Sequence, residues 1–181
     1  VDESNSLWAA AKGGHTAVLE TLLGVPGIAV NQSDTYGCTP LLMASSNGHT
    51  SAVEVLLERG GADVNQAAHH GGTPLLQASW NGHEEVVKVL LMQQDIDVNT
   101  CAKQWGTALD AANAAGHKKV AEMLVRHGSK GWGDMHPNSR PKFRQTMSDA
   151  FLENPKFSSS SRTSSSSDDD EEIRLRKAAS F

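Results

Sequence analysis

The sequence predicts an all-α solenoid, a row of stacked helical repeats, because two independent landmarks recur along the chain with the same spacing. The dipeptide Gly-His begins at residues 14, 48, 82 and 116, and the dipeptide Val-Asn begins at residues 30, 64 and 98. Both series advance by 34 residues. A period of about 20 to 50 residues is typical of arrays in which each unit buries its apolar face on its neighbours.

Each repeat is expected to contain two helices joined by a turn. Thr39 and Thr73 can cap a helix N-terminus, and the proline that follows each of them fits the first helical position, where no N–H donor is needed. Gly48 and Gly82 can adopt the left-handed conformation that ends this helix. The second helix then carries three apolar columns that we interpret as core: Leu19, Val53, Val87 and Ala121; Leu22, Leu56, Leu90 and Leu124; Leu23, Leu57, Leu91 and Val125.

The segments TPLLMASSNGH, TPLLQASWNGH and GADVN resemble ankyrin repeats, whose signature is T-P-L-H-x-A. The resemblance covers residues 5 to about 129 and implies a helix-turn-helix and a β-hairpin loop in each repeat. The chain departs from the family in two ways: the signature histidine is replaced by Trp8, Leu42, Leu76 and Asp110, and each repeat has one extra residue before its Val-Asn. The expected repeats are about 5–37, 38–71, 72–105 and 106–129.

The ends of the array have the features of caps. The first repeat lacks the Thr-Pro start, and the second helix of the last repeat has a polar face made by Lys118, Lys119, Glu122 and Arg126. We therefore expect one array over residues 1–129, followed by an extension over residues 130–157 and a disordered tail over residues 158–181.

Composition excludes several classes of protein. The chain has 181 residues, 38% hydrophobic residues and a net charge of −5, and no apolar run approaches the length of a membrane span. Residues 1–128 hold 7 Lys/Arg against 13 Asp/Glu, which argues against a nucleic-acid surface. The start of the chain is not a signal peptide, and two cysteines form no disulfide framework. We expect an intracellular protein, in the cytoplasm or alternatively in the nucleus, that is monomeric and does not bind membranes.

The histidines do not indicate a metal or catalytic site. His15, His49, His83 and His117 recur once per repeat, so layers about 10 Å apart separate them, and we interpret them as structural. The pair His69-His70 lies in a loop, where a solvated role is favoured over a metal ligand or a pH-sensitive contact. No phosphate-binding loop, nucleophile elbow or acid pair occurs. The sequence predicts no enzyme activity and no cofactor.

Trp80 is the residue that repeat spacing alone does not explain, because it aligns with Lys12, Ser46 and Ala114. The alternatives are a binding residue, which we favour, and a side chain that covers the adjacent repeat. The ankyrin resemblance implies a concave groove formed by hairpin tips and first-helix ends. Its expected partner-binding residues are Tyr36, Met43, Ser46, Asn47, His69, His70, Gln77, Trp80, Asn81, Lys103, Gln104 and Trp105.

Trp105 stands where the earlier hairpins have Gly37 and Gly71, with Gly106 one residue late, which is also typical of a distorted turn.

In the C-terminal part we expect one short helix and regulation by phosphorylation. Residues 140–157 place Phe143, Met147, Ala150 and Phe151 at helical spacing, for docking on the last repeat or folding on a partner. A serine run follows, then an acidic block and a basic end. Three serines of the run have an aspartate three residues later, a pattern that resembles the sites of casein-type kinases. The basic segment before the last serine resembles, less closely, the sites of basic-directed kinases. The candidate phosphorylation sites are Ser165, Ser166, Ser167 and Ser180.

The function we favour from the sequence is a protein–protein interaction module or adaptor that binds one partner protein through the groove. The alternative is the targeting or regulatory region of a larger enzyme, such as a kinase or a ubiquitin-ligase subunit, because the chain begins at Val1 rather than at methionine. Nucleic-acid binding through the segment RPKFR is disfavoured by the acidic array.

Overall fold

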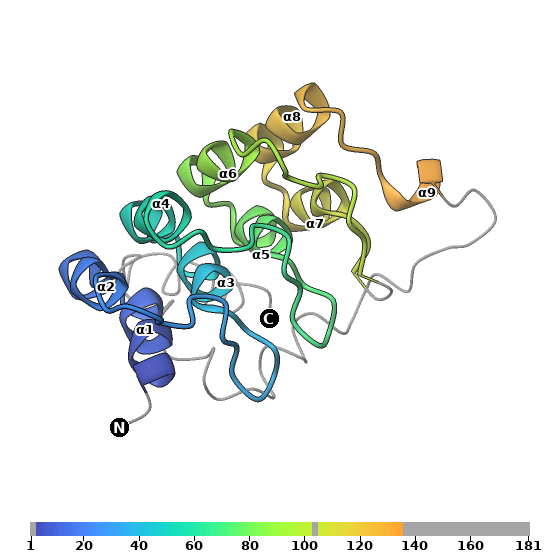
Figure 1. Ribbon diagram of the computed structural model, residues 1–181. Helices are drawn as coiled ribbons and strands as arrows, with labels where there is room; N and C mark the ends of the chain where they lie inside the picture. The colour runs from blue at the N-terminus through green and yellow to red at the C-terminus, as the bar shows by residue number, and fades with distance from the viewer. Residues whose placement is uncertain (1–2, 103–104, 136–181) are drawn as a thin grey trace, which may run out of the picture. The chain divides into compact units, whose positions relative to one another are not determined.

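The computed structural model describes residues 3–102 and 105–135, which form two rows of helices (Figure 1). The first helices of the repeats, α1, α3, α5 and α7, make one row, and the second helices, α2, α4, α6 and α8, make the other. The all-α solenoid is confirmed. The bounds are α1 Glu3–Lys12, α2 Thr16–Leu23, α3 Pro40–Ser46, α4 Thr50–Glu58, α5 Pro74–Asn81, α6 Glu84–Leu91, α7 Ala108–Ala115, α8 Lys118–Arg126 and α9 Trp132–Met135.

The N-termini of the first helices are capped as predicted. The hydroxyl oxygens of Thr39 and Thr73 accept hydrogen bonds from the backbone N–H groups of Leu42 and Leu76, both at 3.2 Å. Proline occupies the first turn of α3 and α5. In α7, Thr107 and Asp110 cap each other reciprocally, so the aspartate that departs from the apolar pattern has a structural role.

The repeated histidines connect each repeat to the one before it. The ring Nε2 atoms of His49, His83 and His117 lie 3.0, 2.9 and 3.0 Å from the carbonyl oxygens of Lys12, Ser46 and Trp80. A carbonyl oxygen only accepts, so each Nε2 carries the donated proton. The structural interpretation of these histidines is confirmed, and their partner is the adjacent repeat.

The glycines at positions 14, 48 and 82 each lie against the histidine ring of the next repeat. Gly82 has a φ of +73°, a conformation that costs an L-residue energy. A Cβ atom at Gly82 would also lie 2.5 Å from the His117 ring, and one at Gly48 would lie 2.6 Å from the His83 ring. Both requirements exclude a side chain.

The asparagines of the Val-Asn series form a second row of contacts between repeats. The Oδ1 atoms of Asn31 and Asn65 accept from the backbone N–H groups of Asp63 and Asp97, both at 2.9 Å. Asn99 repeats the pattern with the N–H of Lys130 at 2.8 Å. The two landmarks that reveal the period in the sequence are therefore both inter-repeat hydrogen bonds.

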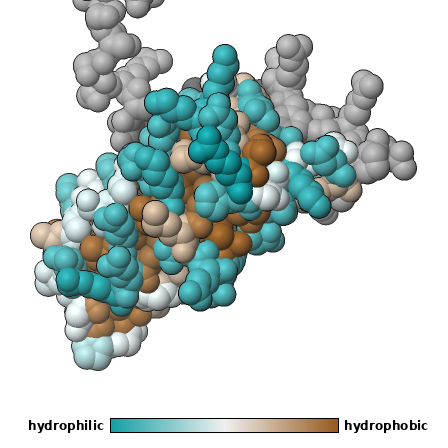
Figure 2. Space-filling model, turned by 90° about the horizontal axis from the view of Figure 1, so that it is seen from above, coloured by the Kyte–Doolittle hydropathy of each residue, from teal (hydrophilic) through white to brown (hydrophobic). Residues whose placement is uncertain are grey.

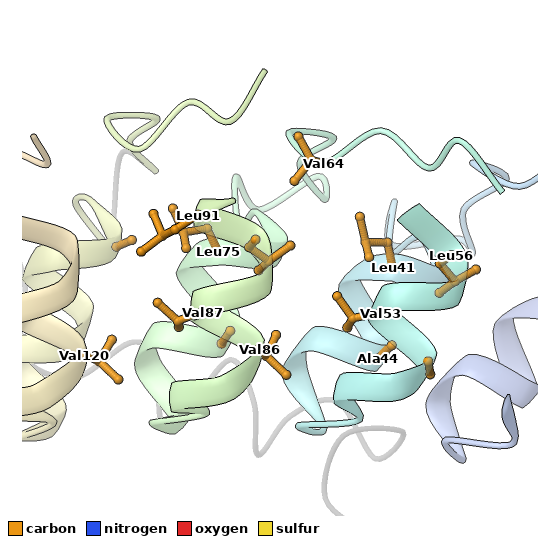
Figure 3. Close-up of a cluster of buried hydrophobic side chains, with 14 of the residues drawn as sticks. Leu41, Ala44, Val53, Leu56, Val64, Leu75, Val86, Val87, Leu91 and Val120 are labelled. Atoms are coloured by element: carbon orange, nitrogen blue, oxygen red, sulfur yellow. The ribbon is translucent and has the colours of Figure 1, made fainter. Parts of the chain in front are cut away.

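The core lies between successive helix pairs, where Val53, Leu56, Val86 and Val87 project toward their neighbours (Figure 3). Most of the predicted columns are buried, as expected. Leu22, Leu23 and Leu57 are partly buried. Val125 is 57% exposed, because no further helix pair among the described residues covers α8. That part of the prediction is wrong.

One further apolar column was not predicted from the sequence. It consists of Val18, Ala52, Val86 and Val120, of which the last three are buried and Val18 is 48% exposed. Val18 lies in the first of the described repeats, and none of the described residues forms a repeat before it. The face of the molecule shown in Figure 2 is mostly hydrophilic, with apolar side chains between the polar ones. Each end of the stack thus leaves one apolar position uncovered.

Replacing Leu90 by alanine should lower the free energy of unfolding by about 2–5 kcal/mol, because its fully buried side chain would leave a cavity. Urea denaturation followed by circular dichroism measures this difference. Met92→Ala is the matched control, since this apolar side chain is 78% exposed and its loss should change stability by less than about 0.5 kcal/mol. Equal effects of the two substitutions would contradict the assigned core.

The array should lose stability on acidification in part through His83. Burial lowers the pKa of His83; the bond to the Ser46 carbonyl opposes this shift, and the charges of His49 and His117 add to it. Below an ordinary histidine pKa of about 6.5, the unfolded chain therefore binds a proton that the folded chain does not. Stability is unaffected above that pH and falls as the pH drops through the window down to the folded pKa.

His83→Gln keeps an amide donor near Ser46 but removes the titration, so it should reduce the difference in urea midpoint between pH 7.5 and pH 5.5. His15→Gln is the control, because His15 occupies the same repeat position and is exposed. If both variants keep the wild-type difference, His83 does not contribute to the acid sensitivity.

Candidate functional site

The candidate site begins at three tight hairpin loops that project beyond the first helices (Figure 1). Within each loop, the backbone N–H of Asp34, Ala68 or Ala102 donates to the carbonyl oxygen four residues later, at 3.1, 2.9 and 3.0 Å. The first two loops have a left-handed glycine in the fourth position, Gly37 and Gly71. The third has it one residue later, at Gly106, so the distorted turn predicted around Trp105 is confirmed.

Neighbouring loops are joined at their tips. The backbone N–H of His69 donates to the carbonyl oxygen of Tyr36 at 2.9 Å. The His69 ring lies against Gly37, where a Cβ atom would come within 2.7 Å of it. Tyr36 is 46% exposed and His69 is exposed. Two predicted partner-binding residues therefore lie side by side on the surface.

The ends of the first helices present polar groups around Trp80. Trp80 is half-buried near the end of α5, and its carbonyl oxygen accepts from His117. The Asn81 amide donates to the carbonyl oxygens of Ser46 and Gln77, both at 3.1 Å. The backbone that carries the indole is thus held by the repeats on both sides.

Four residues predicted to contact a partner are buried, and the prediction is wrong for their side chains. Met43 and Gln77 are fully buried, and both occupy the same position of a first helix that packs against the first helices of the neighbouring repeats. Trp105 is 2% exposed, and its ring packs against His70. Ser46 is also buried, although its carbonyl oxygen accepts from Asn81 and His83.

Trp105, His70 and Gln77 pack together beneath the second and third loops. The rings of His70 and Trp105 have centroids 4.4 Å apart and an interplanar angle of 59°. Nε2 of Gln77 lies 3.3 Å from Nε2 of His70. Gly72 allows this packing, because a Cβ atom there would lie 2.6 Å from the Gln77 amide. The solvated role expected for the histidine pair therefore holds for His69 and is wrong for His70.

The environment of His70 favours its neutral form. Burial lowers its pKa, the charge of His69 adds to the shift, and the charge of Asp34 opposes it. An amide nitrogen only donates, so the Gln77 contact also requires an unprotonated Nε2 on His70. The packed cluster thus stays uncharged at neutral pH and supports the loops from below.

Three predicted residues remain. Asn47 is half-buried, and its side-chain amide donates to the Met43 carbonyl oxygen at 2.9 Å; the other two are not described by the structure. Lys103 and Gln104 lie outside the described residues, as do the predicted helix over 140–157, the tail and the candidate phosphorylation sites. Of the predicted residues, Tyr36, Asn47, His69, Trp80 and Asn81 keep exposed or half-buried side chains, and we call this set the tip surface.

The described part of the chain offers little for covalent or metal chemistry. Both cysteines are free thiols, and burial, with the carboxylate of Asp34 adding to it, raises the pKa of Cys38 to about 12. A thiol of that pKa is not a nucleophile at neutral pH. Within residues 3–102 and 105–135, no three histidine, cysteine or acidic side chains come close enough to hold a metal ion.

No helix in this part of the chain is long and apolar enough to cross a membrane.

The comparison with known families agrees with the architecture. The family model described as ankyrin repeats, in three copies, matches residues 6–102. No individual curated protein matches the chain. Ankyrin repeats are generally protein–protein interaction modules and are typically not catalytic. With four stacked helix pairs, a hairpin loop after each of the first three, and a family match over more than half its length, the chain belongs to the ankyrin-repeat family.

Proposed function

We propose that this chain is a non-enzymatic adaptor that binds a partner protein through the tip surface. The observation that carries the proposal is Trp80, a half-buried indole on a surface where the other repeats have Lys12, Ser46 and Ala114. The stack forms around each of those side chains, so stacking does not need an aromatic residue there. Binding of a partner protein is the role that best accounts for an aromatic residue at this position.

The tip surface has the chemistry of an interaction hot spot. Tyrosine and tryptophan are enriched at such sites because they offer a large contact area and one polar atom each. Asn47, His69 and Asn81 add hydrogen-bond donors and acceptors to the same set of residues. A partner that presents apolar side chains between backbone or amide groups would fit this surface.

Rigid presentation is the mechanism. The Trp80 backbone is fixed by His117, and the Tyr36 loop is fixed by His69. A surface that is already ordered loses little conformational entropy when it binds, so more of the contact energy appears as affinity. The two free thiols support an intracellular setting for this proposal, since disulfides are typical of secreted proteins.

The double variant Tyr36→Ala/Trp80→Ala should lose a partner that the wild-type chain captures from native lysate. Each truncation at a hot spot typically weakens binding by about 2 kcal/mol or more, so the pair should reduce capture to background. Affinity pull-down with mass spectrometry identifies the partner, and calorimetry on the purified pair then measures the change in affinity.

Two further variants make the result interpretable. Met92→Ala removes an exposed apolar side chain outside the tip surface and should capture the same partner as wild type. Trp105→Ala removes a buried indole and should lower the melting temperature, which the Tyr36/Trp80 double variant should not. If the double variant melts normally and still captures every wild-type partner, the tip surface is not the binding site.

A further inference from the structure

Three side chains converge over Gly72, one from the second loop, one from the third loop and one from α5. A Cβ atom on Gly72 would lie 2.6 Å from Nε2 of Gln77 and 2.8 Å from Nε2 of His70. The ring of Trp105 would be 3.1 Å away. The carbonyl oxygen of Gly72 also closes the second loop, by accepting from the N–H of Ala68 at 2.9 Å. A movement within this cluster therefore acts directly on the backbone of the loop.

The Gln77 amide uses its nitrogen and not its oxygen in this arrangement. Its Nε2 lies 3.3 Å from Nε2 of His70 and only donates, so the proton of the neutral His70 ring is on Nδ1. The Oε1 atom of Gln77 is buried and accepts no hydrogen bond from the described residues. A buried acceptor without a donor costs free energy. The amide is therefore stabilised by turning whenever a donor appears at His70.

A proton on His70 supplies that donor. Protonated histidine carries an N–H on both ring nitrogens, so Nε2 of His70 would then face Nε2 of Gln77 as donor against donor. Rotation about the last side-chain bond of glutamine is soft, and a half-turn exchanges its nitrogen and oxygen. The half-turn brings Oε1 to the charged ring. The cluster thus has one hydrogen-bonded arrangement for each charge state of His70.

A charge on His70 also acts on the loop that carries Tyr36. The charged groups that act on His70 are His69, which repels a second positive charge, and Asp34 of the first loop, which attracts it. Oδ1 of Asp34 accepts from the backbone N–H groups of Tyr36 and Cys38, both at 2.9 Å. Those two bonds hold the first loop in its turn, and a cation at His70 competes for the same carboxylate.

The other elements around the cluster add no further charge that is free to respond. Neither α3 nor α5 contains a charged residue. The described part of the third loop, residues 99–102 and 105–107, has Cys101 as its one titratable side chain. The one charged residue of α7 is Asp110, which is held in the reciprocal cap with Thr107.

We propose that His70 and Gln77 form a pH-sensitive support for the tip surface. When His70 takes up a proton, the Gln77 amide turns and the first loop loosens, because Asp34 shifts from its turn toward the new charge. Burial lowers the pKa of His70, so this happens below an ordinary histidine pKa of about 6.5. A partner that binds the ordered loops then binds most tightly above that pH, a consequence that rests on the proposed function.

The chain without a partner tests the switch. Nitrogen NMR of the rings should place the proton of His70 on Nδ1 at pH 7.5, whereas His83, which donates to a carbonyl oxygen, carries it on Nε2. The His69 amide donates to Tyr36, and its protection from exchange, relative to an unfolded peptide at the same pH, should fall at least about threefold by pH 5.5. His70→Gln should abolish this fall, and the control His69→Gln should keep it.

Gln77→Met separates the switch from a purely structural role. This variant copies Met43, the buried residue at the same position of the second repeat, so the array should fold. Without the amide, the preference of His70 for the Nδ1 proton should disappear. Its titration should also move to lower pH, because a hydrogen bond to the charged ring is the stronger of the two that are lost. An unchanged tautomer and midpoint in this variant, or an Nε2 proton on neutral His70 in the wild type, would overturn the proposal.

The effect on binding is measured separately, by calorimetry with the protein captured in the pull-down. The wild-type chain should bind that protein up to about tenfold less tightly at pH 5.5 than at pH 7.5, the limit for one proton taken up, and His70→Gln should bind it equally at both. Equal wild-type affinities, or a fall that His70→Gln retains, would overturn the link to binding. If the tip surface is not the binding site, the NMR result still decides whether the switch exists.

Discussion

The regular stacking of this chain depends on the hydrogen bond from the histidine of one repeat to the backbone of the repeat before it. His49, His83 and His117 make this bond at almost the same distance. Each ring occupies the space that a side chain would fill at the preceding glycine of the earlier repeat. At Gly116 no atom lies within 4 Å of that space, because the described array ends there. In Gly48-His49 and Gly82-His83, the histidine therefore contacts the preceding repeat and the glycine contacts the following one.

The same bond connects stability with recognition. The acceptor for His117 is the carbonyl oxygen of Trp80, the residue on which the proposed binding surface depends. The buried cluster of His70, Gln77 and Trp105 supports the loops that carry Tyr36 and His69 in a similar way. Residues that never touch a partner thus hold the ones that would, and a mutation in either group would weaken binding for a different physical reason.

The ends of the stack follow a different rule from its middle. An inner repeat is covered on both sides, whereas Val18 and Val125 each lack one neighbouring repeat among the described residues and are exposed. Asp110 shows how the last repeat adapts: its carboxylate accepts from the N–H and hydroxyl of Thr107 and from the N–H of Trp132, and so ties α9 to α7. A stack with one apolar end open can be extended by any helix of suitable pattern.

The sequence by itself determined the repeat length, the helix caps and most of the core, because these depend on local signals: a threonine before proline, a glycine before histidine, and apolar residues at helical spacing. Alignment of repeats also singled out Trp80. The alignment could not show that Met43 and Gln77 are buried, because it assigns each residue a position on a helix but does not show what packs against that position. Trp105 has no counterpart side chain in the earlier loops, which have Gly37 and Gly71 at this position, so the alignment could not show that it is buried. Only the tertiary structure decides such cases, because burial depends on the neighbouring repeat.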